Sequence, residues 1–242
     1  MMENFPSFVD YILVALFGIV IPFVSGVKSS TAFKNLAVPF DFYSRRRFYI
    51  GNSLFLFLMA AIIIIVWWLY SRPFDVLGFT RPSSIGKSIP WWMIALFLFM
   101  YLFDMFYSLF EKNEREDTIE KLHDQTPFMP TEIRDLPAYT VMCISAGVFE
   151  EIVFRGYLIN FFQYVFASVP AGAAWAVITP AIIFSIAHFY QGPGAVFKIL
   201  VLSLLFGMIF WHSGSLYAVI LLHFFVDFIS GLLSIYLAKQ KK

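Results

Sequence analysis

Residues 146–156 read Ala-Gly-Val-Phe-Glu-Glu-Ile-Val-Phe-Arg-Gly, and this stretch lies inside a predominantly apolar segment over residues 137–164. Such a segment is long enough to cross a bilayer as a helix, which needs about 20 residues. Its charged side chains, Glu150, Glu151 and Arg155, would then lie in lipid, where charges are costly and by default mark a functional site. The segment therefore predicts both a membrane fold and a polar site inside it.

The composition extends the membrane prediction to the whole chain. Apolar residues make up 60% of the sequence and charged residues only 14%, and the mean hydropathy is +0.76, beyond what a soluble domain carries. We expect an all-α, polytopic helix bundle in the cell membrane with about seven transmembrane helices, or eight. The expected spans are residues 8–26, 49–70, 91–110, 137–164, 171–190, 195–212 and 215–237.

The chain is expected to form one integrated membrane domain with two parts. Residues 1–136 hold the amino-terminal spans and a polar connector over residues 111–135, and residues 137–237 form the core that carries the candidate chemistry. Asp104 is the exception among the otherwise apolar amino-terminal spans. It could face a cavity, but we expect it instead to cap a helix or to pair near a helix end. The first span is expected to be retained, because Met1-Met2-Glu3 lacks the basic start of a signal peptide.

Basic residues predict the orientation, because they concentrate on the cytoplasmic side of a membrane. One predicted side has only Arg72, Arg81 and Lys87. The other side has Lys28, Lys34, Arg45, Arg46, Arg47, Lys112, Arg115, Lys121, Arg134, Lys198, Lys239, Lys241 and Lys242. We therefore expect the amino terminus outside and the carboxyl terminus in the cytoplasm. The net charge of +1 gives no reason to expect a nucleic-acid partner.

The two adjacent glutamates are expected to have different roles. Glu151 and Arg155 are four residues apart, so on a helix they share a face and can form an ion pair in the favourable order. Glu150 points elsewhere and lacks that partner, which makes it the candidate general base. Cys143 is the only cysteine; it is expected to be a packing residue, with a thiol nucleophile as the minor alternative.

Two later spans carry the remaining candidates. His188 ends the run Phe-Ser-Ile-Ala-His, and His223 and Asp227 are again four residues apart. A histidine can exchange a proton near neutral pH or donate a hydrogen bond to a developing oxyanion, so these residues together suggest a hydrolase. Glu150, His188 and His223 are also an acceptable ligand set for zinc. The spacing does not decide between these readings, and each histidine alone could be a packing residue.

Taken in order, the motifs resemble the CAAX-protease and bacteriocin-processing family, also called the ABI family. The similar residues are Glu150-Glu151-x-x-x-Arg155, Phe184-x-x-x-His188 and Gly214-Ser215-Leu216 leading to His223-x-x-x-Asp227, within residues 137–237. The resemblance implies an intramembrane endopeptidase in which Glu150 and His188 activate a water while His223 and residue 227 bind the oxyanion. Glu151 and Arg155 would hold the site in shape.

Position 227 distinguishes forms of this family, which has Asn or Asp there, and the eukaryotic prenyl-protein proteases resemble the Asn form. This chain has Asp227. An anion cannot donate a hydrogen bond to an oxyanion, so Asp227 is expected to orient His223 or to complete a metal shell.

The favoured interpretation is a protease of the bacterial branch of this family, with a peptide or protein substrate that enters from the membrane or from the cytoplasmic face. Membrane lipid is the other expected partner. No cofactor is favoured, and zinc is the alternative. A non-catalytic immunity or tolerance protein is the second functional class, and a transporter with a proton relay is the third.

Overall fold

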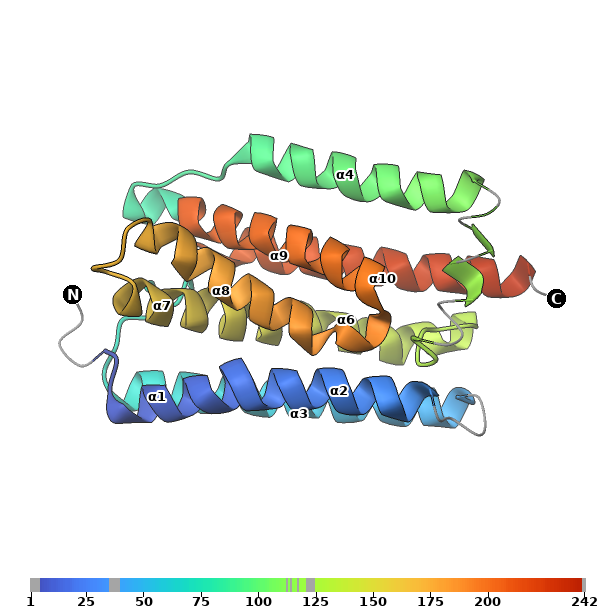
Figure 1. Cartoon of the computed structure of the whole chain (residues 1–242), viewed down its shortest axis with the longest axis horizontal. Coiled ribbons are helices and arrows are strands. Elements are labelled where there is room, and N and C mark those ends of the chain that lie inside the picture. The colour runs from blue at the N-terminus through green and yellow to red at the C-terminus, as the bar shows by residue number, and fades with distance from the viewer. Residues whose placement is uncertain are drawn as a thin grey trace.

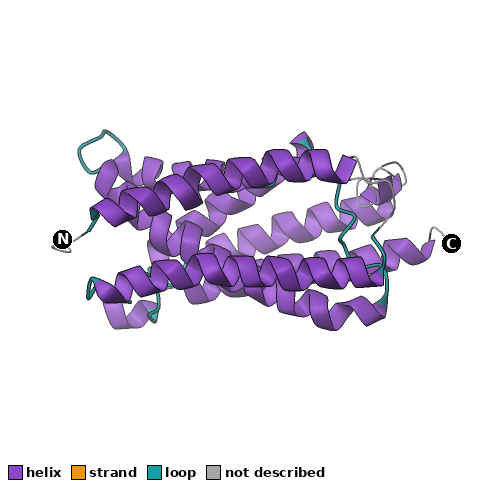
Figure 2. Cartoon of the chain, turned by 90° about the horizontal axis from the view of Figure 1, so that it is seen from below, coloured by secondary structure: helices purple, strands orange, loops and turns teal. Residues whose placement is uncertain are grey.

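The computed structural model describes residues 5–34, 40–111 and 125–240, together with residues 113, 115, 116 and 118–120. All regular secondary structure in these residues is helical, which confirms the all-α prediction. Figure 1 shows long helices that lie along one common axis, with the N and C termini at opposite ends of the bundle. Figure 2 shows the same arrangement of helices from below.

The helices carry the labels of Figure 1. In the first half, they are α1 (Phe8–Ala15), which continues through a π-helical segment (Leu16–Val20) into α2 (Ile21–Lys34), then α3 (Phe42–Leu69) and α4 (Trp91–Phe110). In the second half, they are α6 (Leu136–Glu151), which continues through a π-helical segment (Ile152–Leu158) into α7 (Ile159–Val165), then α8 (Gly172–Ala187), α9 (Pro193–Ser213) and α10 (Leu216–Gln240). Short 3₁₀ turns cover Pro82–Ile85, Ile133–Asp135 and Phe189–Gln191.

Six helical stretches of the described chain are long and apolar enough to cross a membrane. They are Phe8–Ser29, Phe42–Leu69, Trp91–Phe110, Ile133–Val165, Pro193–Ser213 and Leu216–Gln240. The additional predicted span, residues 171–190, is the apolar helix α8, which has only 16 residues. At about 1.5 Å per residue, α8 is shorter than a hydrocarbon core about 30 Å thick. The structure therefore supports a multi-pass membrane protein but not the count of seven.

The short α8 changes the depth of the residues that follow it. Figure 1 shows that the turn between α8 and α9 stops well short of the end of the bundle that α6 and α10 reach. His188 follows α8 directly, in this turn. A histidine at the end of a span can therefore reach the level of residues in the middle of the neighbouring helices.

Helix α3 begins at Phe42, before the predicted start of this span at residue 49. Asp41 caps the helix, because its Oδ1 accepts a 2.7 Å hydrogen bond from the backbone N–H of Ser44. Arg45 was expected in a loop, but it is buried in the first turns of α3 and forms an ion pair with Asp135, with 3.0 Å between Nη2 and Oδ2. Asp135 was likewise expected in the solvated connector and is 2% exposed. Hydropathy missed both because a buried ion pair looks polar in sequence.

The amino-terminal half also contains a buried charge that the sequence analysis did not single out. Asp10 is fully buried in α1 and pairs with Arg72, with 2.6 Å between Oδ2 and Nη2. Tyr157 donates a 2.9 Å hydrogen bond to Oδ1 of Asp10. Asp104 is therefore not the only charged group of these spans, and Arg72 is not a solvated loop residue. This contact ties the first helix to the segment that follows Arg155.

The basic residues that were predicted to lie on opposite sides of the membrane lie at opposite ends of the bundle in the connections that Figure 1 shows. Figure 1 shows the connection between α3 and α4, which holds Arg72, Arg81 and Lys87, at the N-terminal end of the bundle. The starts of α3 and α6 lie at the opposite end. Lys112, Lys121, Lys241 and Lys242 and the side chain of Lys34 lie outside the described residues. The side that faces the cytoplasm stays a prediction.

Helices α6 and α10 come close to each other beside the candidate site. A Cβ atom on Gly147 would lie 3.1 Å from the carbonyl oxygen of Ile220 and 3.2 Å from the backbone nitrogen of Phe224. The absence of a side chain at Gly147 permits this approach, as glycine does in membrane helix pairs. Because Gly147 is one turn before Glu150 and Phe224 is next to His223, the close approach brings these two groups together.

Candidate functional site

A cavity of about 500 Å³ lies inside the helix bundle. Its wall includes predicted site residues from α6, from the π-helical segment after it, from the turn after α8 and from α10. Phe128 and Thr126 from the polar connector also line it. The predicted residues that line the cavity are Glu150, Arg155, His188, His223 and Asp227. Glu151 touches two of them, so the structure brings all six predicted residues together.

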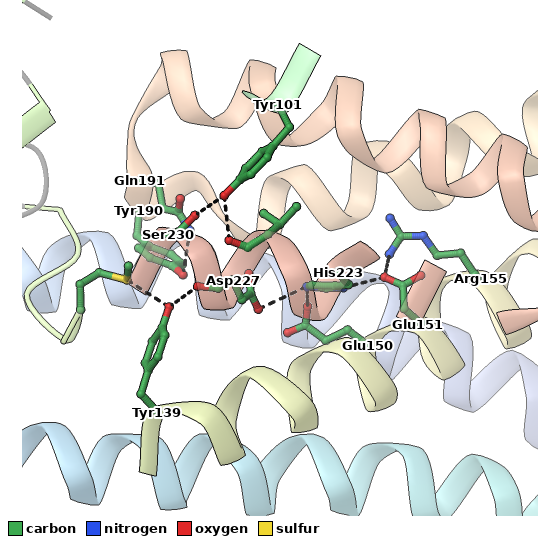
Figure 3. A network of polar contacts seen from close by, with 12 residues as sticks. Tyr101, Tyr139, Glu150, Glu151, Arg155, Tyr190, Gln191, His223, Asp227 and Ser230 are labelled. Atoms are coloured by element: carbon green, nitrogen blue, oxygen red, sulfur yellow. Dashed lines mark hydrogen bonds and ion pairs between the residues drawn. The ribbon is translucent and has the colours of Figure 1, made fainter. Parts of the chain in front are cut away.

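His223 lies at the centre of this polar cluster (Figure 3). Its Nδ1 is 2.7 Å from Oε1 of Glu151, and since the carboxylate can only accept, Nδ1–H is the donor. Its Nε2 lies 3.8 Å from Oε2 of Glu150 and 3.6 Å from Oδ2 of Asp227. The imidazole ring is therefore oriented by Glu151, and its second nitrogen faces the two other carboxylates.

Arg155 holds Glu151 from the other side. Its Nη1 donates to the same Oε1 atom at 2.8 Å, so the predicted Glu151–Arg155 pair is confirmed. Nη2 of Arg155 donates to Oγ of Ser203 at 2.8 Å, and the guanidinium carbon lies 4.9 Å from the ring centroid of Phe184 and 5.4 Å from that of Phe206. These contacts lock the carboxylate that orients the histidine.

The backbone around this pair is π-helical rather than α-helical. The π-helical segment begins at Ile152, directly after Glu151, and includes Arg155. Short π-helical segments of this kind occur frequently at functional sites. The spacing argument assumed an α-helix, and the ion pair is nevertheless present.

His188 approaches the cavity from the turn after α8. Its Nδ1 lies 2.8 Å from the carbonyl oxygen of Phe184, so Nδ1–H is the donor and Nε2 carries the free lone pair. The ring of Phe184 lies close to both histidines, with centroid distances of 4.6 Å to His188 and 6.1 Å to His223. The His188 ring can therefore accept a hydrogen bond at Nε2.

The four charged residues of the cluster other than the histidines fall into two pairs that differ in exposure. The side chains of Glu151 and Arg155 are 0% and 2% exposed, whereas those of Glu150 and Asp227 are 16% and 30% exposed. Glu150 and Asp227 are therefore much more accessible to a molecule in the cavity than Glu151 and Arg155 are. Glu151 and Arg155 can act on such a molecule through His223.

Three residues around the site were not found from the sequence. Ser203 holds Arg155, Tyr139 donates a 2.9 Å hydrogen bond to the backbone carbonyl of Asp227, and Tyr101 donates one of 3.0 Å to that of Val226. Single hydroxyls in apolar spans carry no motif, so the sequence had no signal for them. Tyr139 and Tyr101 fix the part of α10 that presents Asp227.

The charged pair at the edge of the cavity was predicted in part. Asp104 pairs with Lys198, with 2.6 Å between Oδ1 and Nζ, and both residues line the cavity. The expectation that Asp104 pairs is confirmed. Their side chains are 48% and 57% exposed, so this pair is accessible.

A zinc site would require at least three ligand side chains that converge on one point. Across the described ranges, no three His, Cys, Asp or Glu side chains are arranged so that they could hold a metal ion. His223 uses Nδ1 for Glu151 and His188 uses Nδ1 for Phe184, which leaves Nε2 of each ring for other contacts.

Comparison with known proteins agrees with the resemblance seen in the motifs. Residues 132–229 match the family described as Type II CAAX prenyl endopeptidase Rce1-like. No curated protein and no solved structure matches the chain. The matched residues include the π-helical segment, both histidines and all the acids of the cluster. Residues 132–229 of this chain are therefore similar in sequence to the Rce1-like CAAX prenyl endopeptidases.

Proposed function

We propose that this protein is an intramembrane endopeptidase that hydrolyses a peptide bond of a membrane-associated peptide or protein. The observation that carries the proposal is the convergence of Glu150, His188, His223 and Asp227 on one cavity within the helix bundle. An acid, two imidazoles and a buried carboxylate that orients one of them are the groups that water-mediated hydrolysis requires. The family match over residues 132–229 supports the same reaction class.

In the proposed reaction, Glu150 accepts a proton from a water whose second hydrogen is held by Nε2 of His188. The water oxygen bonds to the scissile carbonyl carbon, and His223, protonated on both nitrogens, donates Nε2–H to the oxyanion while Glu151 holds Nδ1–H. Glu150 then returns its proton to the amide nitrogen as the C–N bond breaks. The partial exposure of the Glu150 side chain, at 16%, and the fixed orientation of the two imidazole rings support this assignment.

The substrate is proposed to enter near the start of α9. Asp104 and Lys198 are accessible there, and Thr126 and Phe128 connect the same cavity to the polar segment before α6. Water would arrive by the same route, because this polar segment lies outside the predicted spans. The proposed location is the cell membrane, with the cavity open toward the cytoplasm and α8 as a short seventh crossing.

The experiment that tests the function is cleavage of membrane-bound peptide precursors by the purified protein. Replacing a general base typically lowers the rate by about 10²–10⁴, so Glu150→Gln and His188→Ala should each lose activity by that order while they still insert. The matched control is Cys143→Ala, which changes a fully buried residue of the same helix and should keep activity. Parental rates for Glu150→Gln would refute the assignment, and inactivity of Cys143→Ala alone would point to a thiol mechanism.

A further inference from the structure

A second cavity, of about 400 Å³, lies between the first turns of α3 and α6. Both helices begin at the end of the bundle where the C terminus lies (Figure 1). The α3 side is lined by Phe42, Arg46, Tyr49 and Ile50, and the α6 side by Arg134, Asp135, Pro137, Ala138 and Val141. We call this cavity the α3–α6 groove. None of these residues lines the cavity that contains Glu150.

The α3–α6 groove changes from charged to apolar along the helix axes. Arg46 lies in the first turns of α3, and Arg134 lies in the 3₁₀ turn just before α6. Ile50 is one turn further along α3, and Val141 is about 7.5 Å beyond Leu136, the first residue of α6, at 1.5 Å per residue. The two apolar side chains are 50% and 55% exposed. A groove that is cationic at the membrane surface and apolar toward the bilayer centre has the polarity of a phospholipid molecule.

The two arginines of the groove differ in the contacts that they already make. Arg46 is exposed and forms no hydrogen bond or ion pair with the part of the chain that the structure describes. Arg134 pairs with Glu132 through two contacts, Nε to Oε2 at 2.7 Å and Nη2 to Oε1 at 3.2 Å, and its guanidinium carbon lies 4.6 Å from the ring centroid of Phe42. The Arg134 and Glu132 side chains are 61% and 46% exposed, so water screens their ion pair and a phosphate can compete for the guanidinium. Arg45, by contrast, is already neutralised by buried Asp135. A phosphate between Arg46 and Arg134 would therefore add charge-assisted hydrogen bonds.

Asp135, which lines the groove, has a carboxylate oxygen without a hydrogen-bond donor among the described residues. Asp135 lines the groove and is 2% exposed, and its Oδ1 atom has no hydrogen-bond partner among the described residues. Buried polar atoms are nearly always hydrogen-bonded, so we expect a bound molecule to donate a hydrogen bond to this oxygen. A hydroxyl group of a lipid headgroup would supply it.

We propose that the α3–α6 groove binds an anionic glycerophospholipid with a hydroxylated headgroup, such as phosphatidylglycerol. Arg46 and Arg134 hold the phosphate, Asp135 accepts the headgroup hydroxyl, and an acyl chain lies along Ile50 and Val141. Clusters of arginine beside the ends of membrane helices favour anionic lipids in this way. The site is separate from the peptidase cavity, so it does not depend on the proposed reaction.

The test uses the full chain in detergent, titrated with phosphatidylglycerol or phosphatidylcholine and followed by native mass spectrometry. The protein should retain phosphatidylglycerol and release phosphatidylcholine, which has neither the net charge nor the hydroxyl. Arg46→Gln and Arg134→Gln should each weaken phosphatidylglycerol binding about fivefold, as expected for one arginine at a membrane surface. The matched control is Arg47→Gln, an exposed neighbour that does not line the groove and should bind like the parent.

Two further measurements, one with a variant that blocks the groove and one with soluble competitors, complete the test. Val141→Trp should abolish retention by filling the groove while both arginines remain. Inorganic phosphate and soluble glycerol 3-phosphate should not compete, because they lack the acyl chain. Equal retention of the two lipids, unchanged binding by Arg46→Gln, an equal loss in Arg47→Gln, or displacement by free phosphate would each overturn the proposal.

Discussion

At the scale of residues, the most informative atom is Oε1 of Glu151. It accepts hydrogen bonds from Arg155 and from His223, whereas Oε2 is buried with no partner among the described residues. Glu151 is therefore a positioning residue that depends on two donors for its burial. Loss of Arg155 removes a permanent positive charge from beside the Glu151 carboxylate, whereas loss of His223 removes a donor that is not permanently charged. The two losses should therefore differ in their effect on stability.

Replacing Arg155 with alanine should lower the free energy of unfolding by about 3–5 kcal/mol, because it leaves the Glu151 carboxylate buried without its cation. Thermal unfolding in detergent measures this loss. Lys198→Ala is the control, since it breaks an exposed ion pair with Asp104 that contributes about 0–1 kcal/mol. A variant at Arg155 that is as stable as the parent and yet inactive would place the arginine in direct contact with substrate.

Asp227 separates the metal-free from the zinc mechanism. Because Glu151, and not Asp227, binds Nδ1 of His223, the Asp227→Asn variant should keep its ring orientation and measurable cleavage. The new amide can also donate to the oxyanion. In a zinc site the same change should weaken metal retention. The checks are the cleavage rate, elemental analysis and sensitivity to chelators; about one zinc per chain, with activity restored on adding zinc back, would contradict the metal-free mechanism.

At the scale of elements, the π-helical segment after α6 packs directly against the loop that follows α3. A Cβ atom on Gly156 would lie 2.6 Å from the carbonyl oxygen of Leu77, and Leu77 is fully buried. A shift of the Gly156 backbone would displace Arg155, which is the preceding residue. The glycine therefore sets the distance between the segment with the site and the wall of the bundle.

Gly156→Ala should destabilise the protein by about 1–3 kcal/mol, the usual cost of overpacking, and should lower activity because the shift reaches Arg155. Gly51→Ala is the matched control: Gly51 also lies in a helix, α3, and its Cβ would meet no atom within 4 Å. That change should leave stability equal or slightly higher, by about 0.5–1 kcal/mol. Thermal unfolding and cleavage of both variants test the pair, and equal stability would contradict the close contact with Leu77.

At the scale of the whole molecule, a buried polar contact joins the two halves of the chain. Asp10 in α1 binds Arg72 after α3 and Tyr157 in the second half, all of them buried. The predicted division at residue 136 is therefore not expected to be a boundary between independent units. We propose that the chain unfolds as one membrane domain.

Asp10→Ala should lower the thermal stability of the second half as well as the first, by about 3–5 kcal/mol, because it removes the buried carboxylate that forms the ion pair with buried Arg72. The measurement is the temperature at which cleavage activity is lost, compared with global unfolding. Asp75→Ala is the control, an exposed acid in the same connection between helices. Loss of the first helix with full retention of activity would show that the halves are independent.

Several properties of this protein followed from the sequence alone, for reasons of local physics. Whether an apolar segment crosses the membrane as a helix depends mainly on its own composition and length. The span predicted at residues 91–110 therefore has the same bounds as helix α4. The Glu151–Arg155 pair and the candidate residues also followed from spacing and from the cost of charge in lipid.

The tertiary structure decided what depends on contacts between distant segments. The burial of Arg45, Arg72 and Asp135 required partners that lie far away in the chain, and hydropathy read each as solvated. The orientation of His223 by Glu151 instead of Asp227 depends on how α6 and α10 approach at Gly147. The free-energy cost of burying a charge depends on its ion-pair partner. Which distant residue becomes that partner depends on how the helices pack in three dimensions.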